Sequence, residues 1–72
     1  MYYVKGIYAE DYYKDEDGNR MSWGTRDAVL EYAVKVSRAN LSSLVVFQDV
    51  KAICRTHNGH IEWLIPMKGP YQ

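Results

Sequence analysis

Three absences bear on where this protein works. Cys54 is the only cysteine among 72 residues, so no intramolecular disulfide can form. The first residues lack the basic region and the long apolar run of a signal peptide. The longest apolar run, at 44–47, is far shorter than the roughly 18 residues that a membrane-spanning helix needs. We therefore expect a cytoplasmic protein with no segment embedded in a membrane.

An excess of either charge is also absent. Nine Lys and Arg balance nine Asp and Glu, and a formal net charge of zero removes the general electrostatic argument for nucleic-acid binding. The charges are unevenly spread, however, because residues 1–17 carry most of the acids and residues 18–72 carry most of the bases. Composition therefore leaves open a local basic face.

Groups for catalysis or cofactor binding are few. The sequence has no Gly-rich phosphate loop, and Cys54 and His57 fall on opposite faces of one predicted strand, so the imidazole cannot activate the thiol. His57 and His60 face each other across a predicted turn but lack a third metal ligand. The acidic residues 15–17 do not fit a calcium loop, which would place Gly24 where a carboxylate is required. We expect no enzyme, no metal and no cofactor.

Length determines the domain organisation. Residues 1–72 predict a single domain, because a chain this short can build only one core. Such a core tends to supply only ~3 to 5 kcal/mol of net stability and leaves much of the surface exposed. Association with a partner protein, or with a second copy as a homodimer, is therefore expected.

The N-terminal part predicts one strand followed by a loop. Residues 2–9 are rich in aromatic and β-branched types, which favour a strand. Residues 10–24 lose this pattern and predict an exposed loop, with Asp17-Gly18 as a turn signal. In an alternative arrangement the first strand continues through Tyr12 and Tyr13, and residues 20–23 form a short return strand.

One helix is predicted over residues 26–39. Thr25 is suited to cap its N-terminus, and Asp27 complements the positive end of the helix dipole. Apolar residues at spacings of three and four define its packing face, which carries Val29, Leu30, Tyr32, Ala33, Val34 and Val36. Asn40 is predicted to be the left-handed residue that ends the helix, with Leu41 packing back on the last turn.

The clearest β signal covers residues 44–65. Asn58-Gly59 favours a two-residue type I′ turn, and this turn fixes a hairpin register in which Cys54 faces Trp63. Gln48-Asp49 is either a bulge within one long strand or a turn between two short ones. Alternation defines a core side of the hairpin, with Ala52, Cys54, Thr56, Ile61, Trp63 and Ile65. It places Ile53 and Leu64 on the other side.

These elements predict an α+β fold. One helix packs on a small, mainly antiparallel sheet, in the order β-(loop or short β)-α-β-β. The order of first strand, acidic loop, helix (25–39) and hairpin (44–65) resembles small accessory proteins that bacteriophages make against host and defence machinery, including anti-CRISPR proteins and glycosylase inhibitors with βαββ organisation. This resemblance implies an inhibitor of a CRISPR-type nucleoprotein complex. The sequence departs from the DNA-mimicking members, because it lacks their strongly acidic character.

Tyrosine is abundant, with seven copies that include Tyr71 near the C-terminus. One small core cannot satisfy that many hydroxyl groups, so some tyrosines are expected at the surface, where they are typical of protein interfaces. Covering a thin sheet and stacking on bases are the alternative uses. The predicted protein-binding site joins these tyrosines to the acidic loop and consists of Tyr8, Tyr12, Tyr13, Asp15 and Asp17.

The functional prediction is a small, non-enzymatic protein-binding module. The alternative is a nucleic-acid-binding protein with a basic face on the helix and hairpin, formed by Arg20, Arg26, Lys35, Arg38, Lys51 and Arg55. Salt separates the two, because phosphate contacts weaken steeply as salt rises and a tyrosine-centred interface does not.

Overall fold

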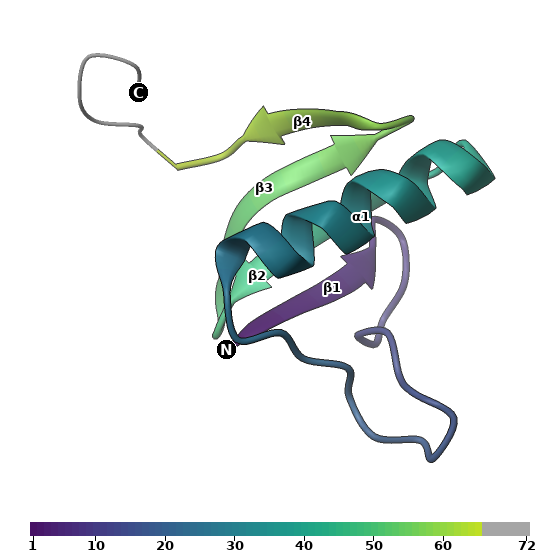
Figure 1. The fold of residues 1–72 in the computed structure, drawn as a ribbon, viewed down its shortest axis with the longest axis vertical. Helices are drawn as coiled ribbons and strands as arrows, with labels where there is room; N and C mark the ends of the chain where they lie inside the picture. Colours follow the sequence, from purple (N-terminus) through teal and green to yellow (C-terminus); the bar gives the residue numbers. More distant parts are fainter. Residues whose placement is uncertain (66–72) are drawn as a thin grey trace.

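The computed structural model describes residues 1–65 and contains one helix and four strands. In chain order these are β1 (Tyr2–Gly6), α1 (Arg26–Asn40), β2 (Ser43–Gln48), β3 (Lys51–His57) and β4 (His60–Trp63). The strands form one antiparallel sheet in the order β1-β2-β3-β4, and α1 crosses one face of it (Figure 1). The predicted α+β fold is confirmed. Tyr71 lies outside the described residues, and within them no helix is long and apolar enough to cross a membrane.

The ends of α1 are defined by their caps. The Thr25 hydroxyl accepts a hydrogen bond from the Ala28 N–H at 3.2 Å, which confirms the predicted N-cap. At the other end the prediction is wrong by one residue, because Asn40 is still helical and Leu41 adopts the left-handed conformation with φ of 50°. The Leu41 N–H donates to the Ser37 carbonyl, and its side chain is exposed instead of packing back on the helix.

The C-terminal strands follow the register that the Asn58-Gly59 turn predicts. Both turn residues have positive φ, and Cys54 lies opposite Trp63. A second two-residue turn, at Asp49 and Val50, separates β2 from β3, so the turn alternative for this region is correct.

A bulge changes which residues of β3 enter the core. Val46 of β2 pairs with Cys54, but the next residue, Phe47, pairs with Ala52, so Ile53 has no partner on β2. Ile53 and Cys54 are therefore both buried, and Ala52 shares the face of Phe47. The predicted placement of Ala52 on the core side and of Ile53 on the other was wrong, because simple alternation assumes an uninterrupted ladder.

The core lies between α1 and the sheet. It consists of Val4, Val29, Ala33, Leu44, Val46, Ile53 and Cys54. Trp63 packs against this core and is half-buried, with the Arg26 guanidinium 5.6 Å from the ring centroid. Ile61 lies on the predicted side but stays 39% exposed, because α1 packs mainly over β1, β2 and β3.

Two fully buried hydroxyl groups join α1 to the hairpin. The Thr56 hydroxyl donates to the Ala33 carbonyl at 3.3 Å. The Ser37 hydroxyl accepts from the Gly59 N–H at 3.0 Å and donates to the Val34 carbonyl at 3.1 Å. These bonds hold the turn between β3 and β4 against the last turns of the helix.

Replacing Ser37 by alanine is therefore expected to lower the free energy of unfolding by about 1–3 kcal/mol, because the Gly59 N–H loses its partner. Urea denaturation followed by circular dichroism measures the change. Ser22→Ala is the matched control, since Ser22 is exposed and its loss should stay within about 0.5 kcal/mol. Equal effects of the two substitutions would show that the buried hydrogen bond is not stabilising.

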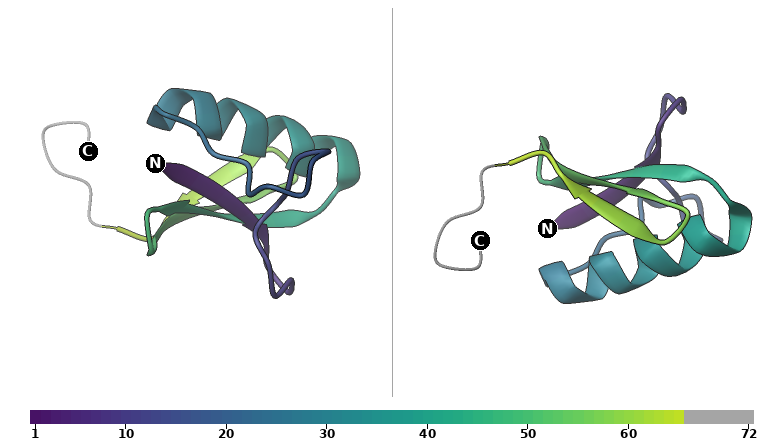
Figure 2. Two further views of the ribbon diagram at one scale, coloured as in Figure 1. Left: turned by 90° about the horizontal axis from the view of Figure 1, so that it is seen from below. Right: turned by 90° about the horizontal axis from the view of Figure 1, so that it is seen from above.

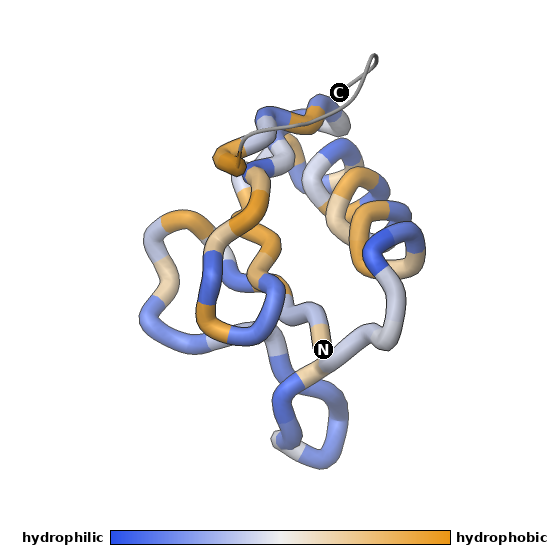
Figure 3. The backbone as a smooth tube through the Cα atoms, turned by 90° about the vertical axis from the view of Figure 1, so that its left-hand side faces the viewer, coloured by the Kyte–Doolittle hydropathy of each residue, from blue (hydrophilic) through white to orange (hydrophobic). Residues whose placement is uncertain are grey.

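The segment between β1 and α1 folds back along the sheet without forming regular strands. Single β-bridges join Lys5 to Tyr12, Lys14 to Arg20, and Tyr2 to Trp23. Figure 3 shows residues 14–20 as a hydrophilic loop at the lower end of the molecule. The alternative prediction, in which the first strand continues through Tyr12 and Tyr13 and residues 20–23 form a return strand, is therefore correct only in part. The backbone pairs at isolated bridges and forms no regular strands there.

Candidate functional site

One face of the sheet is not covered by α1, and we call it the open face. Val4 points into the core under the helix, so its neighbours Tyr3 and Lys5 point to the opposite side. Their partners on β2, Phe47 and Val45, share that side. Figure 2 shows α1 on one side of the sheet only, with the segment that follows β1 projecting on the other side.

Three aromatic rings meet on the open face. The centroids of Tyr3 and Tyr12 are 5.7 Å apart, and those of Tyr12 and Phe47 are 5.2 Å apart with the rings at 80°. Tyr12 reaches this position because the chain returns beside β1, where Lys5 bridges Tyr12 and the Tyr13 N–H donates to the Val4 carbonyl. Such tilted and edge-to-face arrangements are favourable for aromatic pairs.

Two cations complete this aromatic cluster, which we define as Tyr3, Tyr12, Phe47, Lys5 and Arg20. The Arg20 guanidinium lies 4.9 Å from the Tyr3 ring and 4.6 Å from the Tyr12 ring. The Lys5 ammonium lies 5.6 Å from the Phe47 ring. Each contact is worth about 0.5–1 kcal/mol at an exposed position, so the side chains hold one another in place before any partner arrives.

The structure separates the two adjacent tyrosines of the predicted site. Tyr12 belongs to the aromatic cluster, but Tyr13 points to the helix side, where its ring lies 6.3 Å from that of Tyr32. Trp23 packs on the same ring at 4.8 Å. Burial, together with the nearby Tyr13, raises the pKa of Tyr32. Tyr13 therefore supports the packing of α1 on the loop.

The other three predicted residues lie on the segment that follows β1. Tyr8 is 95% exposed. The Asp15 carboxylate accepts hydrogen bonds from the N–H groups of Asp17 and Asn19, both at 2.9 Å, so it stabilises the turn. Asp17 is exposed. Of the five predicted residues, Tyr12 alone enters the aromatic cluster.

Sequence reasoning missed the meeting of Tyr3, Phe47 and Arg20. Alternation along residues 2–9 places Tyr3 and Lys5 on one face, which is a partial signal. The remaining signal is absent from the sequence, because Phe47 and Arg20 arrive through long-range pairing and through a loop without regular secondary structure.

Polar groups occupy the other end of the open face. The Arg55 Nε donates to the Glu62 carboxylate at 2.8 Å, and Ser43 Oγ hydrogen-bonds to His57 Nδ1. These residues line a hollow together with Ile7, His60 and Ile61. Within residues 1–65 no group of three or more His, Cys, Asp and Glu side chains is placed to hold a metal ion.

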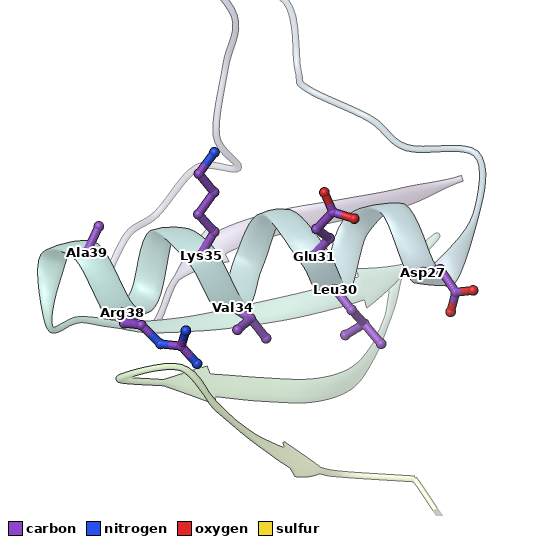
Figure 4. A pocket seen from close by; sticks show the side chains of 7 residues that line it. All are labelled: Asp27, Leu30, Glu31, Val34, Lys35, Arg38 and Ala39. Atoms are coloured by element: carbon purple, nitrogen blue, oxygen red, sulfur yellow. The ribbon is translucent and has the colours of Figure 1, made fainter.

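The outer surface of α1 is a second candidate. Figure 4 shows Leu30, Val34 and Arg38 projecting toward the β3–β4 hairpin, whereas Glu31 and Lys35 project away from it. Asp27 and Glu31 lie toward the N-terminal end of this shallow groove, and Lys35 and Arg38 lie toward its C-terminal end. It therefore offers no single charge to a ligand.

The six cations of the alternative nucleic-acid site are likewise dispersed. Arg20 and Arg55 lie on the open face, whereas Lys35 and Arg38 line the outer groove of α1. Arg26 covers Trp63 on the helix side. The helix and hairpin thus do not present these six residues on one surface.

The open face, with its aromatic cluster at one end, is the candidate functional site. Comparison with protein-family models, with curated proteins and with solved structures found no match for this chain.

Proposed function

We propose that this protein is a non-enzymatic protein-binding module that docks a partner on its open face. The observation that carries the proposal is the aromatic cluster, in which the rings of Tyr3, Tyr12 and Phe47 meet on the uncovered side of the sheet. Arg20 lies over the two tyrosine rings. Tyrosine and arginine are enriched among the residues that dominate binding energy in protein interfaces.

The surroundings of the cluster support docking of a protein. A polar hollow lined by Asp11, Tyr12, Lys14 and Arg20 borders the cluster, and the hollow beside Arg55 and His57 lies at the other end of the open face. A partner that covers the aromatic cluster and the two hollows would form an interface with an aromatic centre and a polar rim, which is the usual arrangement in protein interfaces. The exposed Asp17 would add a negative charge at this rim that selects a basic partner patch.

The resemblance to small phage accessory proteins extends the proposal to the class of partner. A stoichiometric inhibitor of a CRISPR-type nucleoprotein complex needs a rigid contact surface and no catalytic groups. The pre-formed aromatic cluster supplies such a surface, because its rings are already ordered by one another and by Arg20.

Nucleic-acid binding is the second candidate, and one observation favours it. Aromatic rings on an antiparallel sheet beside Lys5 and Arg20 are the groups that stack bases and contact phosphates in single-strand-binding proteins. The protein proposal is preferred, because the chain has no net positive charge, its basic residues are dispersed over several surfaces, and Arg55 is paired with Glu62.

The test compares capture of partners from bacterial lysate by the wild-type protein and by Tyr12→Ala, followed by affinity measurement on each purified partner. Loss of this central ring is expected to weaken binding by at least ~2 kcal/mol, which is more than tenfold in Kd. Glu31→Ala on the outer surface of α1 is the control and should bind as wild type. Circular dichroism confirms that both variants are folded.

Two results would overturn the proposal. In the first, folded Tyr12→Ala and Phe47→Ala bind every captured protein as tightly as wild type. In the second, the protein binds single-stranded nucleic acid through Tyr12, with an affinity that falls steeply as salt rises, and this would establish the second candidate.

A further inference from the structure

The two edges of the sheet differ in how they are protected. The outer edge of β1 is covered by the segment that follows it, because isolated backbone β-bridges join Tyr2 to Trp23 and Lys5 to Tyr12. The outer edge of β4 has no strand or bridge beside it in the described part of the chain. Strand β4 has no proline, lysine or bulge; its protection is limited to its four-residue length and the charge of Glu62, which disfavours pairing with an acidic strand.

Register shows which backbone groups this edge offers. The Leu64 N–H donates to the Ile53 carbonyl at 2.9 Å, and hydrogen-bonded positions alternate along an antiparallel pair. His60 and Glu62 therefore direct their backbone groups toward β3. Ile61 and Trp63 direct theirs away from the sheet, where a further strand could bond to them.

We propose that β4 pairs antiparallel with β4 of a second copy of this chain, around a two-fold axis at Ile61. In this register the two Ile61 residues exchange backbone hydrogen bonds, and each His60 lies opposite Glu62 of the other copy. The exposed Ile61 side chains also face each other, which removes apolar surface from water.

Charge favours this register over an axis at the neighbouring Glu62, and it fits a second copy as the occupant. An axis at Glu62 would place two carboxylates opposite each other, which is destabilising for a cross-strand pair. An axis at Ile61 instead gives two pairs of histidine with glutamate, so the edge is complementary to itself. The contact is small, because it involves one short strand from each copy, and the dimer is accordingly weak and dependent on concentration.

The dimer would have a consequence that goes beyond docking of a partner. Continuing the sheet through β4 places the two α1 helices on one side and the two open faces on the other. A two-fold partner could then engage both aromatic clusters at once, which raises avidity without any new contact.

Sedimentation equilibrium of the full chain over a wide concentration range tests the proposal. The wild-type protein is expected to show a monomer–dimer equilibrium. His60→Glu, which places two carboxylates opposite each other, should weaken the dimer at least tenfold, whereas His60→Lys at the same exposed position should strengthen it. Ile61→Pro should abolish the dimer, because proline removes an N–H that points away from β3 and so leaves the hairpin bonds intact.

Tyr12→Ala is the control and should dimerise as wild type, because its ring lies on the open face away from β4. This variant also separates dimerisation from the partner binding proposed above. A wild-type protein that stays monomeric at the highest concentration would overturn the inference. A dimer that is unchanged by both His60→Glu and Ile61→Pro in folded protein would do the same.

Discussion

Leu44→Ala is expected to abolish cooperative folding of this protein at room temperature. Leu44 belongs to β2, and its side chain projects from the sheet toward the helix, where the residue is only 1% exposed. Truncating a buried leucine to alanine typically costs about 2–5 kcal/mol, because apolar contacts are lost and a cavity remains. A domain of this size tends to have only about 3–5 kcal/mol of net stability, so one such change removes most of it.

Thermal denaturation followed by circular dichroism and tryptophan fluorescence measures this effect. Leu41→Ala is the matched control, because it removes the same atoms from a side chain that is 72% exposed. The control should melt within a few degrees of wild type. A Leu44→Ala protein that melts cooperatively at the wild-type temperature would contradict the assignment of Leu44 to a tightly packed core.

The parts of the fold that the sequence predicts correctly depend on local chemistry. Thr25 caps α1 because a hydroxyl three residues before an N–H can accept from it, and no distant residue is needed. Asn58 and Gly59 have positive φ because a two-residue hairpin turn requires it, and the register of β3 with β4 follows directly. Such signals lie within a few residues of the structure they specify.

The parts that the sequence does not predict depend on contacts between distant residues. The bulge that buries Ile53 is set by how β2 pairs with β3, and alternation within β3 alone cannot reveal it. Leu41, an apolar residue with positive φ, ends α1 although Asn40 has the better intrinsic preference for that conformation. Strand pairing overrides the alternation within β3, whereas the exposed Leu41 ends α1 through a local backbone hydrogen bond to the Ser37 carbonyl.

The candidate site shows the same division. Tyr12 is predicted as a binding residue from composition alone, and it lies at the centre of the aromatic cluster. Its neighbour Tyr13 has the same side chain and the same local sequence environment, yet it packs against Tyr32. The path of the loop as it returns along β1 determines which of the two tyrosines lies on the open face. This path is held by isolated β-bridges, and these leave no periodic pattern in the sequence.

Cys54 is expected to be almost unreactive toward thiol reagents in the folded protein. Its side chain is fully buried, and burial raises the pKa of the thiol from 9.0 to about 11, although the Arg26 guanidinium acts in the opposite direction. Because the thiolate is the reactive form, a rise of about two pKa units lowers its population about a hundredfold near pH 8. Loss of access to the reagent slows the reaction further. The measurement compares absorbance-monitored modification by a disulfide reagent in buffer and in urea, and equal rates would contradict the buried position.

The same pKa shift predicts that the fold weakens in alkali. The folded state binds the thiol proton more tightly than the unfolded chain does, so the stabilising contribution is fully present below about pH 9 and is lost as pH rises through about 11. Two pKa units correspond to about 3 kcal/mol at most. Urea denaturation of the wild type and of Cys54→Val, which fills a similar volume without ionising, measures the effect at pH 8, 10 and 11. The tyrosines titrate in both proteins, so their effect cancels in the comparison. The wild type should therefore lose stability relative to Cys54→Val between pH 8 and 11. A constant difference in the free energy of unfolding would show that the thiol does not control alkaline stability.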